Sequence, residues 1–387
     1  MPHDDRDDAT IDGNASTMNP TLSRRQLVAG AGATWILTAI ADDAEALPGP
    51  LPVFTDAATL PLIGRAFPDT MAGWQRIAAD AFPDLPPVVK DRLTHAAGLA
   101  VSFRTDSPEI TARWCTSDAG QNSNLTPIAQ RGLDLYVRRG TAWLWAGVGR
   151  PGDTKMCNED WLVRHMDAGE KHCLLYLPLY KELKSLEIGI APGCYLRPAA
   201  SPFTKRVAIY GSSIVQGASA SRPGMAYPAR LSRRLGVDVI NLGVSGVARM
   251  EPAVAQLVAE VEADAYILDC VPNSSPEQIS QRAGNLVRTL RARRPKAPII
   301  VLMSILREAG RFDRVVAERV ARQNAAMLAE MTALTDIRDL TIVSGEALLG
   351  DDGETSIDGT HPNDIGFDRM LRIIGPTLQQ VLNRPVS

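Results

Sequence analysis

The chain has few cysteines, and they are not arranged to hold a metal ion or a dense set of disulfides. Its 387 residues include five cysteines, with no C-x-x-C pair and no cysteine–histidine cluster at metal-ligand spacing. Because five is an odd number, at least one thiol has no disulfide partner within the chain. The sequence therefore excludes a disulfide-rich scaffold, and it leaves open one or two bridges in the N-terminal half.

The sequence also lacks an excess of positive charge. It has 41 Lys and Arg against 44 Asp and Glu, a formal net charge of -3. Proteins that bind nucleic acids usually carry a basic patch or stripe, so this balance argues against a nucleic-acid partner. With 45% hydrophobic and 22% charged residues, the composition is that of a globular chain with ample material for a core.

Residues 1–46 are predicted to be a disordered, polar leader followed by an export signal. Arg24 and Arg25 precede a modestly apolar stretch at residues 27–41, which is too short and too rich in Gly and Ala to span a membrane. Residues 44–46, Ala-Glu-Ala, have the form of a signal-peptidase site. Paired arginines indicate the twin-arginine route. These features together predict an exported protein that is periplasmic or extracellular. The mature protein is expected to have no stable membrane span. The alternative is that the segment is an amphipathic N-terminal arm of a cytoplasmic protein.

Residues 47–198 have the pattern of antiparallel strands. Three stretches, at 98–117, 132–149 and 172–190, alternate apolar and polar side chains between breaks of Gly, Pro, Asp and Asn. Half-buried strands have this alternation. We therefore predict a β-sandwich accessory domain, jelly-roll-like, over residues 47–198, with a proline-containing linker at residues 191–205.

From residue 199 to 387, short and nearly continuous apolar runs alternate with helix-length segments. The runs are VAIYG, DVINLG, AYILDC, APIIVLMS and LTIVSG, and such runs are typical of strands covered on both faces. Segments at 251–262, 277–294 and 313–335 are long enough for helices. Strand alternating with helix predicts an α/β domain with a doubly wound parallel sheet.

The α/β half contains the groups that nucleophilic catalysis by a serine requires: a nucleophile, a base and an acid that orients the base. Ser212 and Ser213 follow the first apolar run, where open α/β sheets place their ligands. His361 is the only histidine after residue 199, and Asp358 precedes it by three residues. One tight loop can therefore direct the carboxylate at the imidazole, although a D-x-x-H pair alone is usually an ordinary turn.

Two further turns offer hydrogen-bond donors. Gly246 in NLGVSG follows the second run, where a glycine lets a backbone N–H approach a ligand closely. Asn273 in LDCVPN follows the third run and presents a side-chain amide. Each turn has an ordinary structural explanation. Together, however, the four turns offer Ser, Gly, Asn and D-x-x-H in strand order, which favours a catalytic site.

In this order the motifs resemble the four sequence blocks of SGNH hydrolases, of the GDSL-like lipase and acylhydrolase kind. Residues 132–136, Gly-Leu-Asp-Leu-Tyr, resemble the G-x-D-L-Y signature of an N-terminal companion domain of that family. The resemblance spans nearly everything after the signal and implies an SGNH, flavodoxin-like fold. It also implies site residues: a triad and an oxyanion hole formed by two backbone N–H groups and one amide, namely Ser213, Asp358 and His361 for the triad and Ser213, Gly246 and Asn273 for the oxyanion hole.

The sequence departs from the family pattern beside two of these residues. Ser212 stands where the family's G-D-S-L has aspartate, and Ser274 stands where its G-x-N-D has the second acid. Neither change removes a proton-transfer group or an oxyanion donor. The G-x-S-x-G nucleophile elbow is absent around Ser213, which argues against the α/β-hydrolase fold with similar chemistry.

The resemblance implies a serine esterase that hydrolyses carboxylic esters through an acyl-enzyme and calls for no metal or organic cofactor. Its expected partner is a small-molecule or glycan ester, with a short acyl group on a sugar preferred. Arg222 and Arg249 border the site and could contact an acidic or polyhydroxy substrate. The first alternative is a non-catalytic carbohydrate-binding protein whose hydrolase domain has lost its activity. The second alternative is a protein with a structural or adhesion role.

Overall fold

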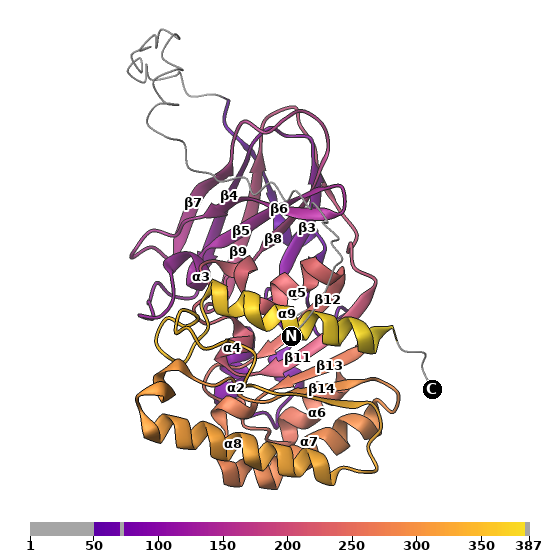
Figure 1. Cartoon of the computed structure of the whole chain (residues 1–387). Helices are drawn as coiled ribbons and strands as arrows, with labels where there is room; N and C mark the ends of the chain where they lie inside the picture. Colours follow the sequence, from indigo (N-terminus) through magenta and orange to yellow (C-terminus); the bar gives the residue numbers. More distant parts are fainter. Residues whose placement is uncertain (1–49, 70–72, 384–387) are drawn as a thin grey trace, which may run out of the picture. The chain divides into compact units, whose positions relative to one another are not determined.

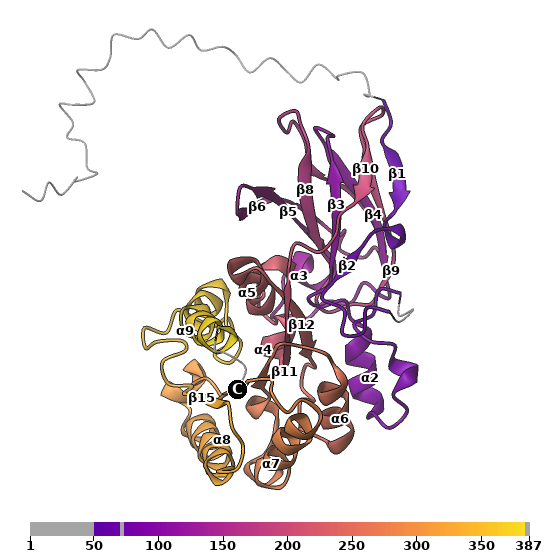
Figure 2. The same cartoon turned by 90° about the vertical axis from the view of Figure 1, so that its right-hand side faces the viewer.

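The structure is a computed structural model that describes residues 50–69 and 73–383 (Figures 1 and 2). The predicted export signal, with Arg24 and Arg25, lies outside the described residues. The chain from Pro50 onward forms one compact unit. Over the described ranges, no helix is both long enough and apolar enough to cross a membrane.

The N-terminal half contains antiparallel sheets, as its alternating pattern predicts. One sheet has the strand order β1 (Val53–Asp56), β9 (Leu183–Ile190), β4 (Ile110–Thr116), β7 (Cys157–Val163). The other has the order β10 (Leu196–Pro198), β3 (Ala100–Thr105), β8 (Lys171–Tyr176), β5 (Leu133–Arg139), β6 (Ala142–Gly149), with β2 (Leu62–Ile63) also paired to β3. Apolar side chains from both sheets form a common core that includes Phe103, Trp114, Leu135, Leu175 and Ile188.

Two local features refine the sequence analysis of this half. The stretch expected to be a linker contains β10, which pairs with β3 at the edge of its sheet. Pro198 fits there because an edge strand tolerates a missing N–H donor. A disulfide joins Cys115 of β4 to Cys157 of β7, so one of the bridges that the sequence leaves open is formed.

The second half is a five-stranded parallel sheet, which confirms the predicted α/β fold. Its order is β12 (Val237–Gly243), β11 (Lys205–Gly211), β13 (Ala265–Asp269), β14 (Ile299–Leu302), β15 (Leu340–Val343), the 2-1-3-4-5 order of flavodoxin-like sheets. Val207 and Ile209 pack with α5 (Tyr227–Leu235) and α9 (Asp364–Leu382). Ala208 and Tyr210 pack on the other face with α6 (Pro252–Glu260), α7 (Pro276–Arg293) and α8 (Arg314–Ala333) (Figure 2).

Residues on the N-terminal side of the predicted boundary at residue 198 pack into the core of the second half. Val89 and Leu93 of α2 (Pro87–Thr94) belong to the core of the parallel sheet, in the same cluster of buried side chains as Val254 and Leu257 of α6. Arg76 is fully buried and donates hydrogen bonds to the carbonyl oxygens of Asn241 and Gly243 at the end of β12. The boundary therefore marks a change of strand pattern, while part of the N-terminal half completes the α/β core.

Candidate active site

The two serines after β11 have different places in the local structure. Ser212 is the N-cap of the short helix α4 (Ser213–Gln216), and its Oγ accepts a hydrogen bond from the N–H of Ile214 at 3.2 Å. Ser213 is the first residue of that helix, and its Oγ lies 2.9 Å from Nε2 of His361. Ser213 is therefore the serine that faces an imidazole, whereas Ser212 caps the helix.

His361 is oriented by the loop that precedes α9. Its Nδ1 lies 2.7 Å from Oδ2 of Asp358, and its backbone N–H donates to Oδ1 of the same carboxylate at 2.8 Å. Because Nδ1 donates to a carboxylate, Nε2 is left to accept the hydrogen bond of the Ser213 hydroxyl. The structure thus joins the three predicted triad residues in one hydrogen-bonded chain.

The charge state of Asp358 suits this arrangement. Burial raises the pKa of its carboxyl, but hydrogen bonds from the His361 backbone N–H and imidazole outweigh burial, and the pKa falls to about 2. The carboxylate is therefore ionised at neutral pH, where it accepts the Nδ1 proton and stabilises positive charge on the imidazole.

The two other predicted residues follow the strands on either side of β11. Gly246 follows β12 and has a left-handed backbone with φ of 77°, a conformation in which a side chain would be strained. Asn273 ends the short 3-10 helix Val271–Asn273 after β13. Its Oδ1 accepts from the N–H of Ala248 at 3.3 Å. In the part of the chain that the structure describes, its NH₂ group has no acceptor, which leaves that group free to donate to a ligand.

Two residues of the β-rich half reach this site although no sequence motif marks them. Nδ2 of Asn124 lies 3.1 Å from Oδ2 of Asp358. The hydroxyl of Tyr180 donates to the backbone carbonyl of Ser213 at 3.4 Å. Both residues lie in connections between strands, where the alternating pattern carries no information. Only the packing of the two halves brings them to the triad.

The two arginines expected near substrate have different surroundings. Arg222 forms an ion pair with the fully buried Asp134 at 2.9 Å and donates to the hydroxyl of Tyr136. Its guanidinium therefore joins the two halves, and its contact with substrate stays a prediction. Arg249 is exposed, and within the described residues its side chain forms no ion pair or hydrogen bond. Its contact with substrate stays a prediction.

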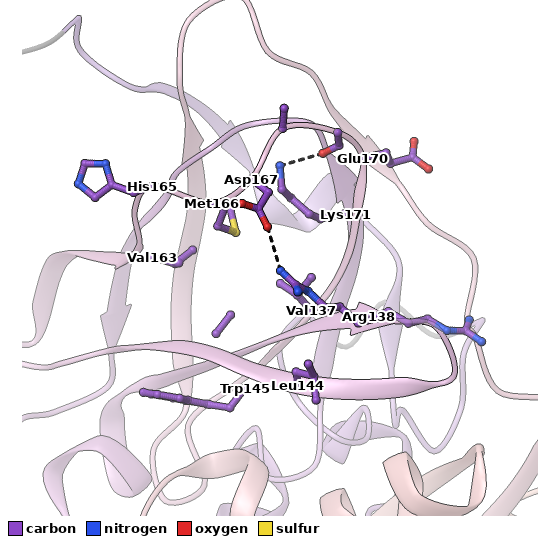
Figure 3. A pocket seen from close by; sticks show the side chains of 14 residues that line it. Val137, Arg138, Leu144, Trp145, Val163, His165, Met166, Asp167, Glu170 and Lys171 are labelled. Carbon is purple, nitrogen blue, oxygen red and sulfur yellow. Dashed lines mark hydrogen bonds and ion pairs between the residues drawn. The ribbon is translucent and has the colours of Figure 1, made fainter. Parts of the chain in front are cut away.

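Two cavities differ in their relation to the triad. One, of about 430 Å³, is lined by polar groups that include Ser245, next to Gly246, and Tyr180, which contacts Ser213. The other, of about 500 Å³, lies in the β-rich half between Leu144 and Trp145 of β6 and the loop from His165 to Glu170 (Figure 3). No predicted site residue lines this second cavity.

A serine, an imidazole and a carboxylate joined at the carboxyl edge of a parallel sheet are the arrangement of a serine hydrolase. Residues 204–379 match the GDSL-like lipase/acylhydrolase family, and residues 53–196 match the GxDLY family, the N-terminus of SGNH-hydrolase-type esterases. The chain belongs to the GDSL-like lipase/acylhydrolase family, and it is a carboxylic ester hydrolase.

Several solved structures share the fold of this chain. A GDSL-like lipase from Bacteroides ovatus ATCC 8483 is 46% identical, with a TM-score of 0.84 over 87% of this chain and 100% of that one. A salicylyl-acyltransferase from a tetracycline biosynthetic pathway shares the fold at 19% identity, with a TM-score of 0.68 over 87% of this chain and 99% of that one. An acetyl xylan esterase from Butyrivibrio proteoclasticus shares it at 12% identity, with a TM-score of 0.56 over 85% and 98%. No curated protein matches the sequence.

Proposed function

We propose that this protein is an exported esterase that hydrolyses esters of short-chain acids with sugars or other polyols. The reaction would pass through an acyl-enzyme on Ser213. The proposal rests on the hydrogen-bonded chain of the triad. Oγ of Ser213 lies 2.9 Å from Nε2 of His361, and Nδ1 of His361 lies 2.7 Å from Oδ2 of Asp358. Such a chain lets the imidazole remove the hydroxyl proton as the oxygen attacks an ester carbonyl.

The proposed reaction has two acyl transfers. In the first, Oγ of Ser213 bonds to the ester carbonyl carbon while Nε2 of His361 takes the proton, and the resulting imidazolium then protonates the departing alcohol. In the second, water attacks the acyl-enzyme, His361 takes its proton, and Ser213 leaves with that proton as the free hydroxyl. Asp358 keeps its negative charge throughout and holds Nδ1 protonated.

The oxyanion of each tetrahedral intermediate would be met by three donors. These are the backbone N–H of Ser213 at the start of α4, the backbone N–H of Gly246 and the NH₂ group of Asn273. The hydrogen bond from Ala248 to Oδ1 supports this assignment for Asn273, since it fixes the amide with its donor side free. Donors held in place before the reaction need no reorganisation in the transition state.

The polar cavity beside Ser245 supports a hydroxylated leaving group. Each of its charged groups has a partner of opposite charge: Lys181 pairs with Asp118, Arg92 with Asp91, and Glu182 with Lys184 outside the cavity lining. The cavity therefore offers no unpaired charge for an ionic ligand. Burial, followed by the nearby Arg76 and Arg92, lowers the pKa of His95 to about 3, so its ring is a neutral donor and acceptor. Neutral polar groups suit the hydroxyls of a sugar or polyol.

A small acyl group fits the enclosed position of the nucleophile. Ser213 is only 8% exposed, which leaves little open surface for a long acyl chain. The acetyl xylan esterase with the same fold acts on a short acyl group of a glycan, as its name states; at 12% identity this likeness shows the fold alone.

A panel of esters tests the substrate proposal. We expect p-nitrophenyl acetate to be hydrolysed faster than the butyrate, and the butyrate faster than the octanoate. Acetylated sugars should have a lower KM than simple alkyl acetates, because their hydroxyls add hydrogen bonds in the polar cavity. Steady-state kinetics measure both the order of rates among acyl groups and the order of KM values among alcohols. A preference for octanoate would contradict the short acyl group, and equal KM values would contradict the role of the polar cavity.

Export by the twin-arginine route is part of the proposal. The disulfide between Cys115 and Cys157 supports it, because such bonds persist in oxidising compartments. Replacing Arg24 and Arg25 together with lysine should keep the unprocessed protein in the cytoplasm, as fractionation and mass spectrometry would show. If the doubly substituted protein is still exported and cleaved, it uses another route.

A further inference from the structure

We infer that Asn124, from the β-rich half, is a positioning residue of the triad that holds the Asp358 carboxylate in the plane in which it orients His361. This inference rests on the proposed function of the triad. It assigns the N-terminal half a direct part in catalysis, in addition to its packing against the parallel sheet.

The carboxylate of Asp358 accepts four hydrogen bonds, two on each oxygen. Oδ1 accepts from the backbone N–H groups of Thr360 at 3.0 Å and His361 at 2.8 Å. Oδ2 accepts from Nδ1 of His361 at 2.7 Å and from Nδ2 of Asn124 at 3.1 Å. Four donors occupy the acceptor sites of a carboxylate. Three of them come from its own loop, and Asn124 alone comes from the other half of the chain.

The amide of Asn124 acts on the carboxylate and not on the imidazole. Its Nδ2 also lies 3.3 Å from Nδ1 of His361, but Nδ1 carries the proton that it donates to Asp358. A protonated Nδ1 has no lone pair in the ring plane to accept a hydrogen bond. The Asn124 side chain therefore donates to Oδ2, and this bond contributes to the lowered pKa of Asp358. Without it, the His361 imidazole is the remaining partner of Oδ2.

Asn124 is anchored to the segment that follows the nucleophile helix. Its backbone carbonyl accepts a hydrogen bond from Oγ of Ser219 at 3.0 Å. Two residues later, Oγ1 of Thr126 donates to the carbonyl of Ser221 at 2.7 Å. Ser219 has a left-handed backbone with φ of 68°, an uncommon conformation for a residue other than glycine. The loop that carries Asn124 is therefore tied directly to the chain that carries Ser213.

The G-x-D-L-Y motif secures the same segment from the other side. Asp134 is fully buried and accepts hydrogen bonds from Arg222 and from the backbone N–H of Gly224 at 2.8 Å. A Cβ on Gly224 would lie 2.5 Å from the ring of Tyr136, so only glycine permits this close approach. Residues 219–224 are thus held against β5, and the segment that anchors Asn124 is bonded on both sides.

Substitution of Asn124 tests the inference with p-nitrophenyl acetate. We expect Asn124→Ala to lower kcat about tenfold, at the low end for a hydrogen bond to a charged group in a partly exposed site. KM should not change, because the inferred role acts through Asp358 and involves no contact with substrate. Inactivation of Ser213 by a small phosphonate should slow by the same factor. Ser123→Ala is the matched control, because Ser123 is exposed in the same turn, and it should keep wild-type kcat.

A second variant and a double-mutant cycle distinguish positioning from a structural role. Asn124→Asp keeps the shape of the side chain and replaces the donor with an acceptor, so it should lose at least as much activity as Asn124→Ala. In an Asp358→Asn background, Asn124→Ala should cost less than about twofold, because its effect passes through that carboxylate. Normal kcat in Asn124→Asp, or losses that multiply in the cycle, would overturn the inference. If Ser213→Ala instead retained activity, the proposed function itself would fail.

Discussion

Ser213→Ala is expected to lower kcat for ester hydrolysis by about 10⁶-fold, the size of effect seen when a triad nucleophile is removed. The substitution deletes Oγ, which lies 2.9 Å from the imidazole that would activate it. It leaves the backbone N–H of residue 213 and the rest of α4 in place, so the fold and the melting temperature should change little. Residual activity should be near that of the oxyanion donors alone. Kinetics with p-nitrophenyl acetate and a thermal melt on the same preparation measure both quantities.

Ser212→Ala is the matched control for this result. Its Oγ caps α4 through the N–H of Ile214, and losing such a cap costs about 1 kcal/mol of stability. We therefore expect a lower melting temperature with a substantial part of kcat retained. A serine-reactive phosphonate should label Ser213 in the wild-type protein. Labelling of Ser212, or full activity of Ser213→Ala, is incompatible with the proposed nucleophile.

Asn273→Ala is expected to lower kcat by roughly 10²–10³, about 2.7–4 kcal/mol of barrier, as for other single oxyanion donors. The NH₂ group would bond to the oxyanion more strongly than to the uncharged carbonyl of the bound ester. The loss should therefore fall on kcat and kcat/KM together, with KM little changed. Asn273→Asp keeps the shape of the side chain and replaces the donor with a negatively charged acceptor. It should reduce kcat at least as much.

Ser274→Ala separates this effect from a change in the shape of the turn. The hydroxyl of Ser274 donates to the backbone carbonyl of Ala248 at 3.4 Å. Ala248 is also the residue whose backbone N–H donates to Asn273. We expect Ser274→Ala to lower the melting temperature slightly and to keep kcat. Should Asn273→Ala behave in the same way, with normal kcat and reduced stability, Asn273 is part of the scaffold and contributes no donor to the reaction.

The sequence by itself determined the class of fold and the residues contributed by short motifs. Five apolar runs indicate strands buried on both faces, and alternating helices make them parallel, so their carboxyl ends share one edge of the sheet. Ser213, Gly246 and Asn273 lie two or three residues after the ends of three of those runs. Asp358 and His361 lie in one loop, so their contact is nearly local. For this reason the family resemblance assigns all five before the structure is considered.

Only the tertiary structure decided what the N-terminal half contributes to the site. Periodicity shows that a strand has a buried face, but it does not identify the surface that covers that face. The burial of α2 and Arg76 in the α/β core, the ion pair of Asp134 with Arg222, and the approach of Asn124 to Asp358 across 234 positions of sequence all depend on the packing of the two halves. Such long-range contacts leave no local pattern, because each residue's conformation is compatible with many partners.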